Sequence, residues 1–332
     1  MKNTIERIPL PLAGPMLGFA AMGIMIENYS VTLKSICGAM AVCLLILLLA
    51  KIGTCLDRVK EELEDPVNCS ISAAFSMGLL VLTAYIKPYV GDAVSILWIL
   101  ALAVHVYLLV YFNGHFIYYK FNIKNVYASF FIFYAGLAMS SMTAPNVDMR
   151  EIGRWFFWAA LLFTVIIAVP IIKRYTAVKE IPEQYQPLIC IFAAPASLLL
   201  AGYLNCFEKP VAWLVIVLTV LSVVLYVFVL AVGLKYIVMP FTASFAAYTS
   251  GDLFKMDRRF PDRALGSSAD LCDTAVSKIY ILCQTIKTFN DRFLALLKER
   301  ISKRDGNSAK KLICAEGCPA VHYFPLLFGS RI

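Results

Sequence analysis

Hydrophobic residues gather in nine stretches along the chain, separated by short polar segments. The first eight stretches are 17 to 24 residues long, and a hydrophobic helix needs roughly 20 residues to cross a bilayer. The ninth stretch is shorter and ends where the chain becomes polar. The pattern therefore predicts eight membrane-spanning helices and the beginning of a ninth, at residues 9–25, 35–52, 68–86, 93–112, 126–143, 155–172, 187–204, 211–234 and 236–249.

Composition agrees with this class of protein. Hydrophobic residues make up 60% of the chain and charged residues 16%, with a mean hydropathy of +0.74, whereas soluble domains carry about 25% charged residues. The first stretch has a basic start, as a signal peptide does, but it lacks a convincing small-residue cleavage site, so we interpret it as the first helix. The sequence predicts an all-α, multi-pass membrane protein.

Lysine and arginine residues predict the orientation in the membrane. With the N-terminus in the cytoplasm, eleven of them fall in cytoplasmic loops and five in outer loops, as the positive-inside rule requires. A ninth crossing would place the basic segment after Ser250 outside, against the same rule. We therefore expect a plasma (inner) membrane protein with a cytoplasmic N-terminus, in which either the ninth stretch does not cross or a tenth span is missing.

Prolines recur in the odd-numbered stretches, together with small residues. The first stretch contains Gly14 and Gly18, and the seventh contains Ala194 and Pro195. Proline bends a membrane helix and is tolerated where the bend faces protein or water, and small residues let helices pack closely. Two interpretations stay open: close packing alone, or a ring of kinked odd-numbered helices around an axial conduit, with the even-numbered helices outside.

Residues suited to catalysis or ligand binding are scarce. His105 is the ionisable side chain nearest the middle of a span; a hydrogen bond to a neighbouring helix is favoured over a proton relay. Cys314, Cys318 and His322 are four residues apart, but a glycine and a proline interrupt any helix there, so they do not predict a metal site. No phosphate-binding loop, nucleophile–base set or nucleic-acid motif occurs in the sequence. We expect no enzyme activity, no cofactor and no nucleic-acid partner.

Four local patterns resemble a known family of membrane proteins and occur in the same order. They lie at residues 8–21 (IPLPLAGPMLGFAA), 61–70 (EELEDPVNCS), 181–195 (IPEQYQPLICIFAAP) and 241–249 (FTASFAAYT). The family is that of the tellurite-resistance and dicarboxylate transporters, which includes TehA-type channels and the plant slow anion channels. In the second pattern, Asp65 stands where a histidine is common. The range from the first pattern to the last, residues 8–249, is about three-quarters of the chain.

The resemblance implies ten helices arranged as five hairpins, with the inner helices lining a central pore and commonly with three subunits in the assembly. It implies small anions as substrates: monovalent anions for the channels, and C4-dicarboxylates (malate among them) or sulfite for the transporters. Because the expected pore lacks fixed acidic residues and a buried dicarboxylate ligand, we favour passive, channel-like permeation. The resemblance places pore residues at Gly14, Gly18, Ala194, Pro195, Phe241, Phe245 and Tyr248.

The chain departs from the family pattern at the pore gate. The family motif ends in a phenylalanine whose ring closes the pore, and Ser250 stands at that position here. A serine would leave the pore open. Residues 252–259 (DLFKMDRR) are too polar to continue a membrane helix, so we expect the rest of helix nine and all of helix ten to be missing. The prediction is a transmembrane transport domain at residues 1–250 and a polar, basic tail at residues 251–332.

The tail has three interpretations: a shifted reading frame beginning near Thr249, a disordered extension, or an amphipathic helix. The third rests on apolar residues from Ile279 to Leu296 at alternating three- and four-residue spacing. Three functions also stand. The first is a passive anion channel. The second is a proton-coupled exporter of dicarboxylate, sulfite or tellurite-related anions, with His105 as the titrating group. The third is a non-transporting membrane protein, either a truncated, non-functional copy or an assembly partner.

Overall fold

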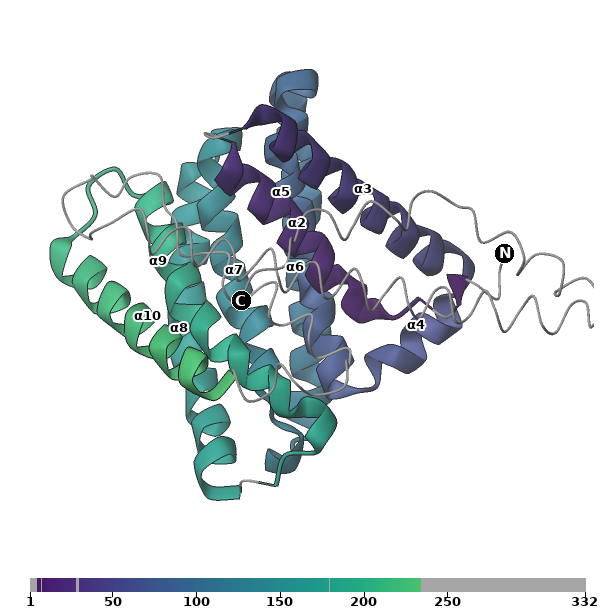
Figure 1. Cartoon of the computed structure of the whole chain (residues 1–332), viewed down its shortest axis with the longest axis vertical. Coiled ribbons are helices and arrows are strands. Elements are labelled where there is room, and N and C mark those ends of the chain that lie inside the picture. Colours follow the sequence, from purple (N-terminus) through teal and green to yellow (C-terminus); the bar gives the residue numbers. More distant parts are fainter. Residues whose placement is uncertain (1–4, 7, 28–29, 179, 234–332) are drawn as a thin grey trace, which may run out of the picture. The chain divides into compact units, whose positions relative to one another are not determined.

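The computed structural model describes residues 5–6, 8–27, 30–178 and 180–233. Within this part of the chain every regular element is a helix (Figure 1). The ninth hydrophobic stretch, the gate position Ser250 and the basic tail lie outside the described residues. The expectations about them, including the domain boundary after residue 250, stay predictions.

Eight main helices follow one another in the order of the eight predicted spans. Among the described residues, five helical stretches are long and apolar enough to cross a membrane, with α5 and α6 counted within the single stretch Pro66–Tyr119, and Leu10–Ile26 is a shorter apolar helix. The prediction of an all-α, multi-pass membrane protein is confirmed. The main helices are α2 (Ala13–Ile26), α3 (Val31–Thr54), α5 (Pro66–Val90), α6 (Val94–Phe112), α7 (Phe131–Thr143), α8 (Arg150–Lys173), α9 (Ala194–Cys206) and α10 (Ala212–Gly233).

Shorter helical segments extend or connect these helices. One of them, α4 (Leu56–Leu63), is an α-helix in the loop between the second and third spans. The 3-10 segments are η1 (Leu10–Leu12), η2 (Gly91–Ala93), η4 (Ile123–Asn125), η5 (Ala128–Phe130), η6 (Ala144–Val147) and η8 (Glu183–Ala193), and the π-helical segments are η3 (Asn113–Tyr119) and η7 (Arg174–Val178).

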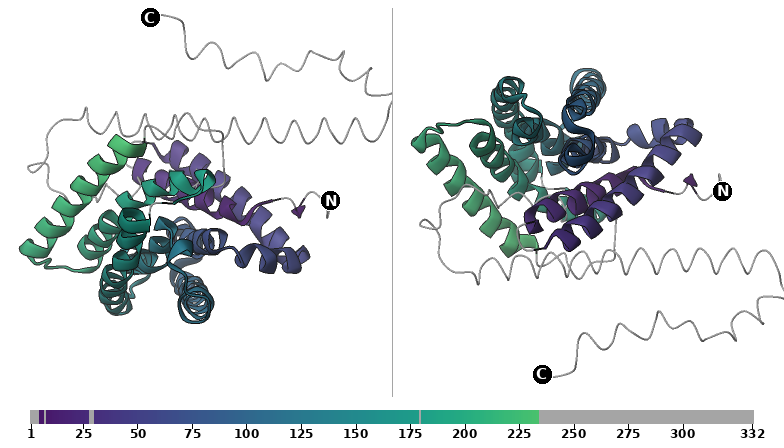
Figure 2. Two further views of the ribbon diagram at one scale, coloured as in Figure 1. Left: turned by 90° about the horizontal axis from the view of Figure 1, so that it is seen from below. Right: turned by 90° about the horizontal axis from the view of Figure 1, so that it is seen from above.

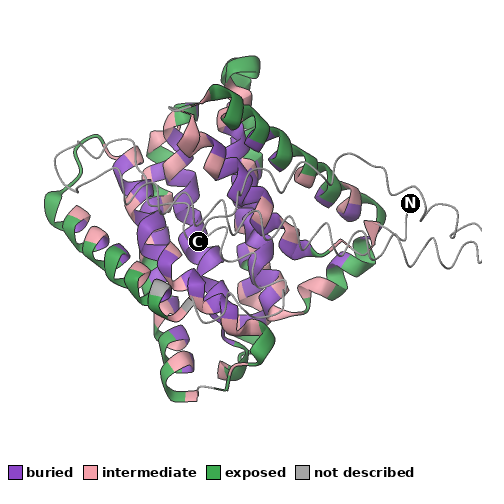
Figure 3. Cartoon of the chain, in the orientation of Figure 1, coloured by how far each residue is buried: buried purple, intermediate pink, exposed green. Residues whose placement is uncertain are grey.

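The main helices form two layers that alternate along the chain. The first, third, fifth and seventh spans, which are α2, α5, α7 and α9, are largely buried. The second, fourth, sixth and eighth spans, which are α3, α6, α8 and α10, expose broad apolar faces (Figure 3). Each inner helix packs against the next one, α2 on α5, α5 on α7 and α7 on α9. Among the outer helices, α10 lies at one edge of this bundle and α3 at the other (Figures 1 and 2). The predicted alternation of inner odd-numbered and outer even-numbered helices is observed.

Small residues set the spacing between inner helices. A Cβ atom added to Gly202 of α9 would lie 2.9 Å from the carbonyl oxygen of Ala138 in α7. One added to Gly78 of α5 would lie 2.3 Å from the terminal methyl group of Met16 in α2. Helices in lipid associate through van der Waals contact, which small residues bring to short range. The small residues of the odd-numbered spans therefore hold the inner layer together.

Prolines shape two of the spans. The seventh span begins as the 3-10 helix η8 and becomes α-helical only at Ala194, because Pro187 and Pro195 lack the N–H group that an α-helical hydrogen bond requires. In the sixth span, Pro170 lies inside α8, which continues to Lys173. A membrane helix tolerates such a proline where its surroundings satisfy the freed carbonyl group.

Candidate functional site

The inner layer contains a small apolar hollow between α5, α7 and the η8–α9 helix. Its volume is about 20 Å³, which is room for about one water molecule. The predicted pore residues Ala194 and Pro195 both line it, at the point where the 3-10 helix becomes α-helical. The complete lining is Met77, Phe131, Ile132, Ala135, Ile191, Ala194, Pro195 and Leu198.

The remaining predicted pore residues are not brought to this hollow. Gly14 and Gly18 are buried in α2, on the helix that packs against α5, and neither of them lines the hollow. Phe241, Phe245, Tyr248 and Ser250 lie outside the described residues. Sequence reasoning missed Met77 and Phe131, because apolar residues inside a hydrophobic stretch carry no signal that separates a cavity-lining position from a packed one.

The inner layer is almost free of charge. No Asp, Glu, Lys or Arg occurs in α2, α7 or α9, and α5 carries Lys87 alone, in its last turn. None of the residues that line the hollow is charged either. A path through such a layer offers no fixed charge to hold a cation and no paired cations to hold a dianion tightly. Its chemistry suits weak, transient contact with a permeating solute.

Asp65 joins two inner helices at the end where they begin. One carboxylate oxygen accepts hydrogen bonds from the backbone N–H groups of Val67 at 3.0 Å and Asn68 at 2.7 Å, which caps the N-terminus of α5. The other accepts the hydroxyl of Tyr185 in η8 at 3.1 Å. The aspartate that stands in place of the family's usual histidine therefore both caps α5 and binds η8.

His105 is fully buried in the outer helix α6 and binds two inner helices. Its Nε2 atom donates to the carbonyl oxygen of Phe133 in α7 at 3.0 Å, and its Nδ1 atom lies 2.8 Å from the hydroxyl of Ser76 in α5. A Cβ atom added to Gly136 would lie 3.0 Å from the ring, so the glycine makes room for it. Both ring nitrogens have partners, which is the arrangement of the favoured expectation, a histidine hydrogen-bonded to its neighbours.

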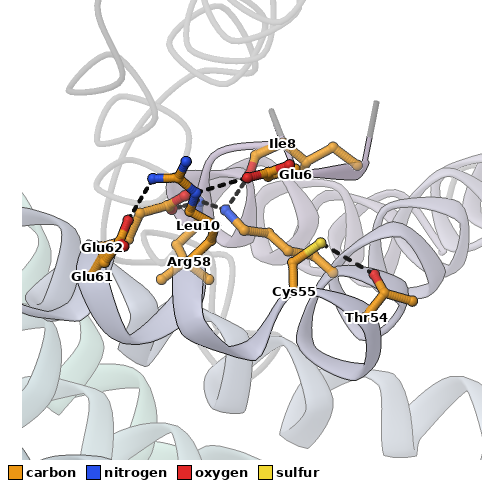
Figure 4. Close-up of polar contacts among 9 residues, drawn as sticks. Glu6, Ile8, Leu10, Thr54, Cys55, Arg58, Glu61 and Glu62 are labelled. Carbon is orange, nitrogen blue, oxygen red and sulfur yellow. Dashed lines mark hydrogen bonds and ion pairs between the residues drawn. The ribbon is translucent and has the colours of Figure 1, made fainter. Parts of the chain in front are cut away.

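A buried ion pair holds the chain segment that leads into α2. Lys51, in the last turn of α3, is fully buried and binds both the Glu62 carboxylate of α4 and the carbonyl oxygen of Ile8. The second oxygen of Glu62 accepts the backbone N–H group of Leu10 at 2.9 Å (Figure 4). Glu62 therefore binds the first residue of η1, directly before the first inner helix.

Arg58 adds an exposed ion pair to the same region. Its guanidinium binds Glu6 at 2.8 Å and Glu61 at 2.6 Å (Figure 4), and these hydrogen bonds raise the pKa of Arg58 above its ordinary value. The charged segment at residues 58–65 consists of most of α4 and the two residues before α5, and it binds the N-terminal segment. Charge alone did not predict this, because Glu6 is more than fifty positions away from Arg58 in the sequence.

Together these features define a class: a multi-pass membrane protein in which buried, nearly uncharged inner helices pack beside outer helices with exposed apolar faces. Within this class, a family model described as voltage-dependent anion channel matches residues 10–252 of the chain. The chain belongs to this family, as the sequence motifs indicated, and the membership implies transport of anions across a membrane. A comparison with curated proteins finds no match.

Proposed function

We propose that the protein is a passive anion channel whose path runs through the layer formed by α2, α5, α7 and α9. The lack of charged side chains in the lining of the inner hollow carries the proposal. A path that lacks acidic residues does not hold cations, and one that lacks paired basic residues does not trap anions. Small monovalent anions such as chloride and nitrate are therefore the proposed substrates, in preference to C4-dicarboxylates or sulfite.

The proposal places the narrowest points of the path at two positions. The first is the hollow beside Ala194 and Pro195, which at about 20 Å³ is too small for a hydrated ion. The second is Ser250, which the family pattern places at the gate. A serine there would leave the gate without its closing ring, so the proposed channel conducts without a trigger.

The arrangement of the protein in the membrane is part of the proposal. We propose a homotrimer with one path in each subunit, in the plasma (inner) membrane, with a cytoplasmic N-terminus. Family resemblance supports the trimer, and the distribution of lysine and arginine between loops supports the orientation. Under this orientation the inner helices begin at the cytoplasmic side, where Asp65 and Tyr185 meet.

The test is anion flux into liposomes that contain the purified protein, measured for chloride, nitrate and malate. We expect flux of chloride and nitrate that exceeds flux of malate, without a requirement for a proton gradient. Ser250→Phe should reduce the flux by restoring a ring at the gate, and Ala194→Phe should reduce it by filling the hollow. The control is Ala212→Phe, because Ala212 is exposed at the start of the outer helix α10 and a ring there faces away from the inner layer.

Two results would contradict the proposal. Flux that requires a proton gradient would favour the coupled exporter instead. Absence of flux from the natural protein, together with failure to recover a defined oligomer in mild detergent, would favour a non-functional copy.

A further inference from the structure

A single arginine is buried where α8 ends. Arg174 begins the π-helical segment η7, and only 1% of its surface is exposed. Its Nε atom donates to the carbonyl oxygen of Lys124 at 3.3 Å, and its Nη2 atom donates to the carbonyl oxygen of Glu180 at 2.5 Å. The guanidinium therefore bridges two connecting segments, one before α7 and one before α9.

No carboxylate in the part of the chain that the structure describes balances the positive charge of Arg174. Among the described residues no Asp or Glu side chain forms an ion pair with Arg174, and its Nη1 atom is buried without a hydrogen-bond partner. The nearby hydroxyl of Tyr127 interacts with the guanidinium but is neutral. Buried charges are normally paired, because removing an ion from water is unfavourable unless a counter-charge or a full set of hydrogen bonds replaces the water. An arginine in this state is suited to receive an anion.

The position of Arg174 places it beside the N-termini of inner helices. Lys124 lies four residues before η5, which leads into α7, and Glu180 lies three residues before η8, which leads into α9. The segments η5 and η8 pack against each other. Because membrane spans alternate in direction, the odd-numbered helices all begin at this end. Helix N-termini carry partial positive charge and attract anions. The backbone at this end and the Arg174 guanidinium therefore both favour binding of an anion.

Two acidic groups close to this end, Asp65 and Glu180, are engaged with other partners. Asp65 caps α5 and accepts the Tyr185 hydroxyl, and the exposed Glu180 carboxylate lies 3.6 Å from the Lys124 ammonium. Neither of them neutralises Arg174. The end of the inner layer therefore combines an unpaired buried guanidinium with the positive ends of helices, and no described carboxylate binds that guanidinium.

We propose that Arg174 forms a binding subsite for one small, singly charged inorganic anion at the end where the inner helices begin. The inference rests on the proposed function and adds a site that binds the anion before it enters the uncharged inner layer. The guanidinium has one nitrogen, Nη1, without a hydrogen-bond partner. A single cation with one such donor fits chloride or nitrate better than a dicarboxylate, which needs a second cation. Because Nη1 is enclosed, the anion reaches it by displacing one of the two carbonyl groups from the guanidinium.

The test measures anion-dependent thermal stability of the full-length protein, which does not require transport. Nanodiscs of neutral phosphatidylcholine hold the protein in potassium gluconate or in potassium nitrate at equal ionic strength. A ligand that binds only the folded state raises Tm, so nitrate should raise the Tm of the natural protein relative to gluconate. Arg174→Gln should abolish this nitrate-dependent increase. The matched control is Lys173→Gln, which removes the same charge from the adjacent, exposed residue and should keep the increase.

A second variant covers the case in which R174Q cannot be recovered. Arg174→Lys keeps the charge but loses the planar donor edge, so half-saturating nitrate should rise about tenfold, the size expected for one charge-assisted hydrogen bond. A nitrate response in R174Q or R174K equal to that of the natural protein would overturn the inference. So would a stabilisation that depends on Arg174 only when anionic phosphatidylglycerol is present, because a lipid headgroup would then be the occupant.

The inference and the proposed function fail separately. Flux in liposomes together with nitrate stabilisation that is independent of Arg174 would remove the subsite and leave the channel. Stabilisation that depends on Arg174 without any flux would remove the channel and leave an anion-binding site.

Discussion

The consecutive helices α9 and α10 differ in an unexpected direction: the less hydrophobic of the two is the more buried. Of the apolar stretch in Glu183–Cys206, 83% is buried, against 22% of the stretch in Ala212–Val229. The α10 stretch is nevertheless the more hydrophobic of the two. In water the more apolar helix would be the buried one. In lipid the surroundings are as apolar as the helix, so hydrophobicity does not decide which helix lies inside.

What separates the two helices is the size and shape of their side chains. The α9 helix carries Pro195, Ala196, Ala201 and Gly202, whereas α10 consists mainly of Val, Leu and Ile. Small residues let a helix approach its neighbours closely on several sides. Bulky branched residues make van der Waals contact with lipid chains as well as they do with protein. Close packing therefore places the helices with small residues in the inner layer. The helices with bulky apolar side chains can lie in the outer layer, where lipid surrounds them.

A bulky side chain at a close helix–helix contact of the inner layer should cause the largest loss of stability. Gly202→Leu places a side chain against the Ala138 carbonyl oxygen, which as backbone cannot move away cheaply. Overpacking of a core costs roughly 1–3 kcal/mol and more where backbone must shift, so we expect a large loss of folded protein, measured by gel filtration in mild detergent. Gly53 of the outer helix α3 has open space around its Cα atom, and Gly53→Leu should leave recovery unchanged. Equal losses in both variants would show that the layers do not differ in this way.

The ion pair between α3 and α4 should produce the next largest effect. Glu62→Gln removes the counter-charge of the fully buried Lys51, and breaking such a buried pair costs about 3 kcal/mol. Arg58→Gln breaks the exposed pairs with Glu6 and Glu61 in the same region, where Arg58 is 56% exposed, and should cost much less, because solvent screens exposed ion pairs. Unfolding of the two variants in mixed micelles of increasing SDS content measures both costs. Similar destabilisation in both would mean that burial of Lys51 does not govern the strength of this contact.

Sequence predicted the layers better than it predicted their polar connections. The eight spans follow from the length of the hydrophobic stretches, and the inner position of the odd-numbered ones follows from proline and small residues. Ala194 and Pro195, which the family motif places at the pore, line the hollow, and their role in a pore stays a prediction. These signals are local, so a single sequence can carry them.

The missed polar contacts depend on residues that are distant in the sequence. Asp65 and Tyr185 are 120 positions apart, and Arg174 binds a carbonyl group 50 positions away. Lys51 and Arg174 look like ordinary loop charges at the ends of spans, where positive residues are common. Only their burial distinguishes them, and burial depends on how the spans pack.

His105 provides the last and smallest test of the two layers, because it lies on an outer helix and binds two inner ones. His105→Ala removes the contacts with Ser76 and Phe133, and interhelical hydrogen bonds in membrane proteins are worth about 0.6 to 1.7 kcal/mol each. We therefore expect a loss of roughly 2 kcal/mol in SDS unfolding. Tyr107→Phe, on the lipid-exposed side of the same helix, should cause none. Flux per folded H105A protein should keep the pH dependence of the natural protein, because passive permeation needs no titrating group. A loss of pH-dependent flux without a loss of stability would instead assign His105 to proton coupling.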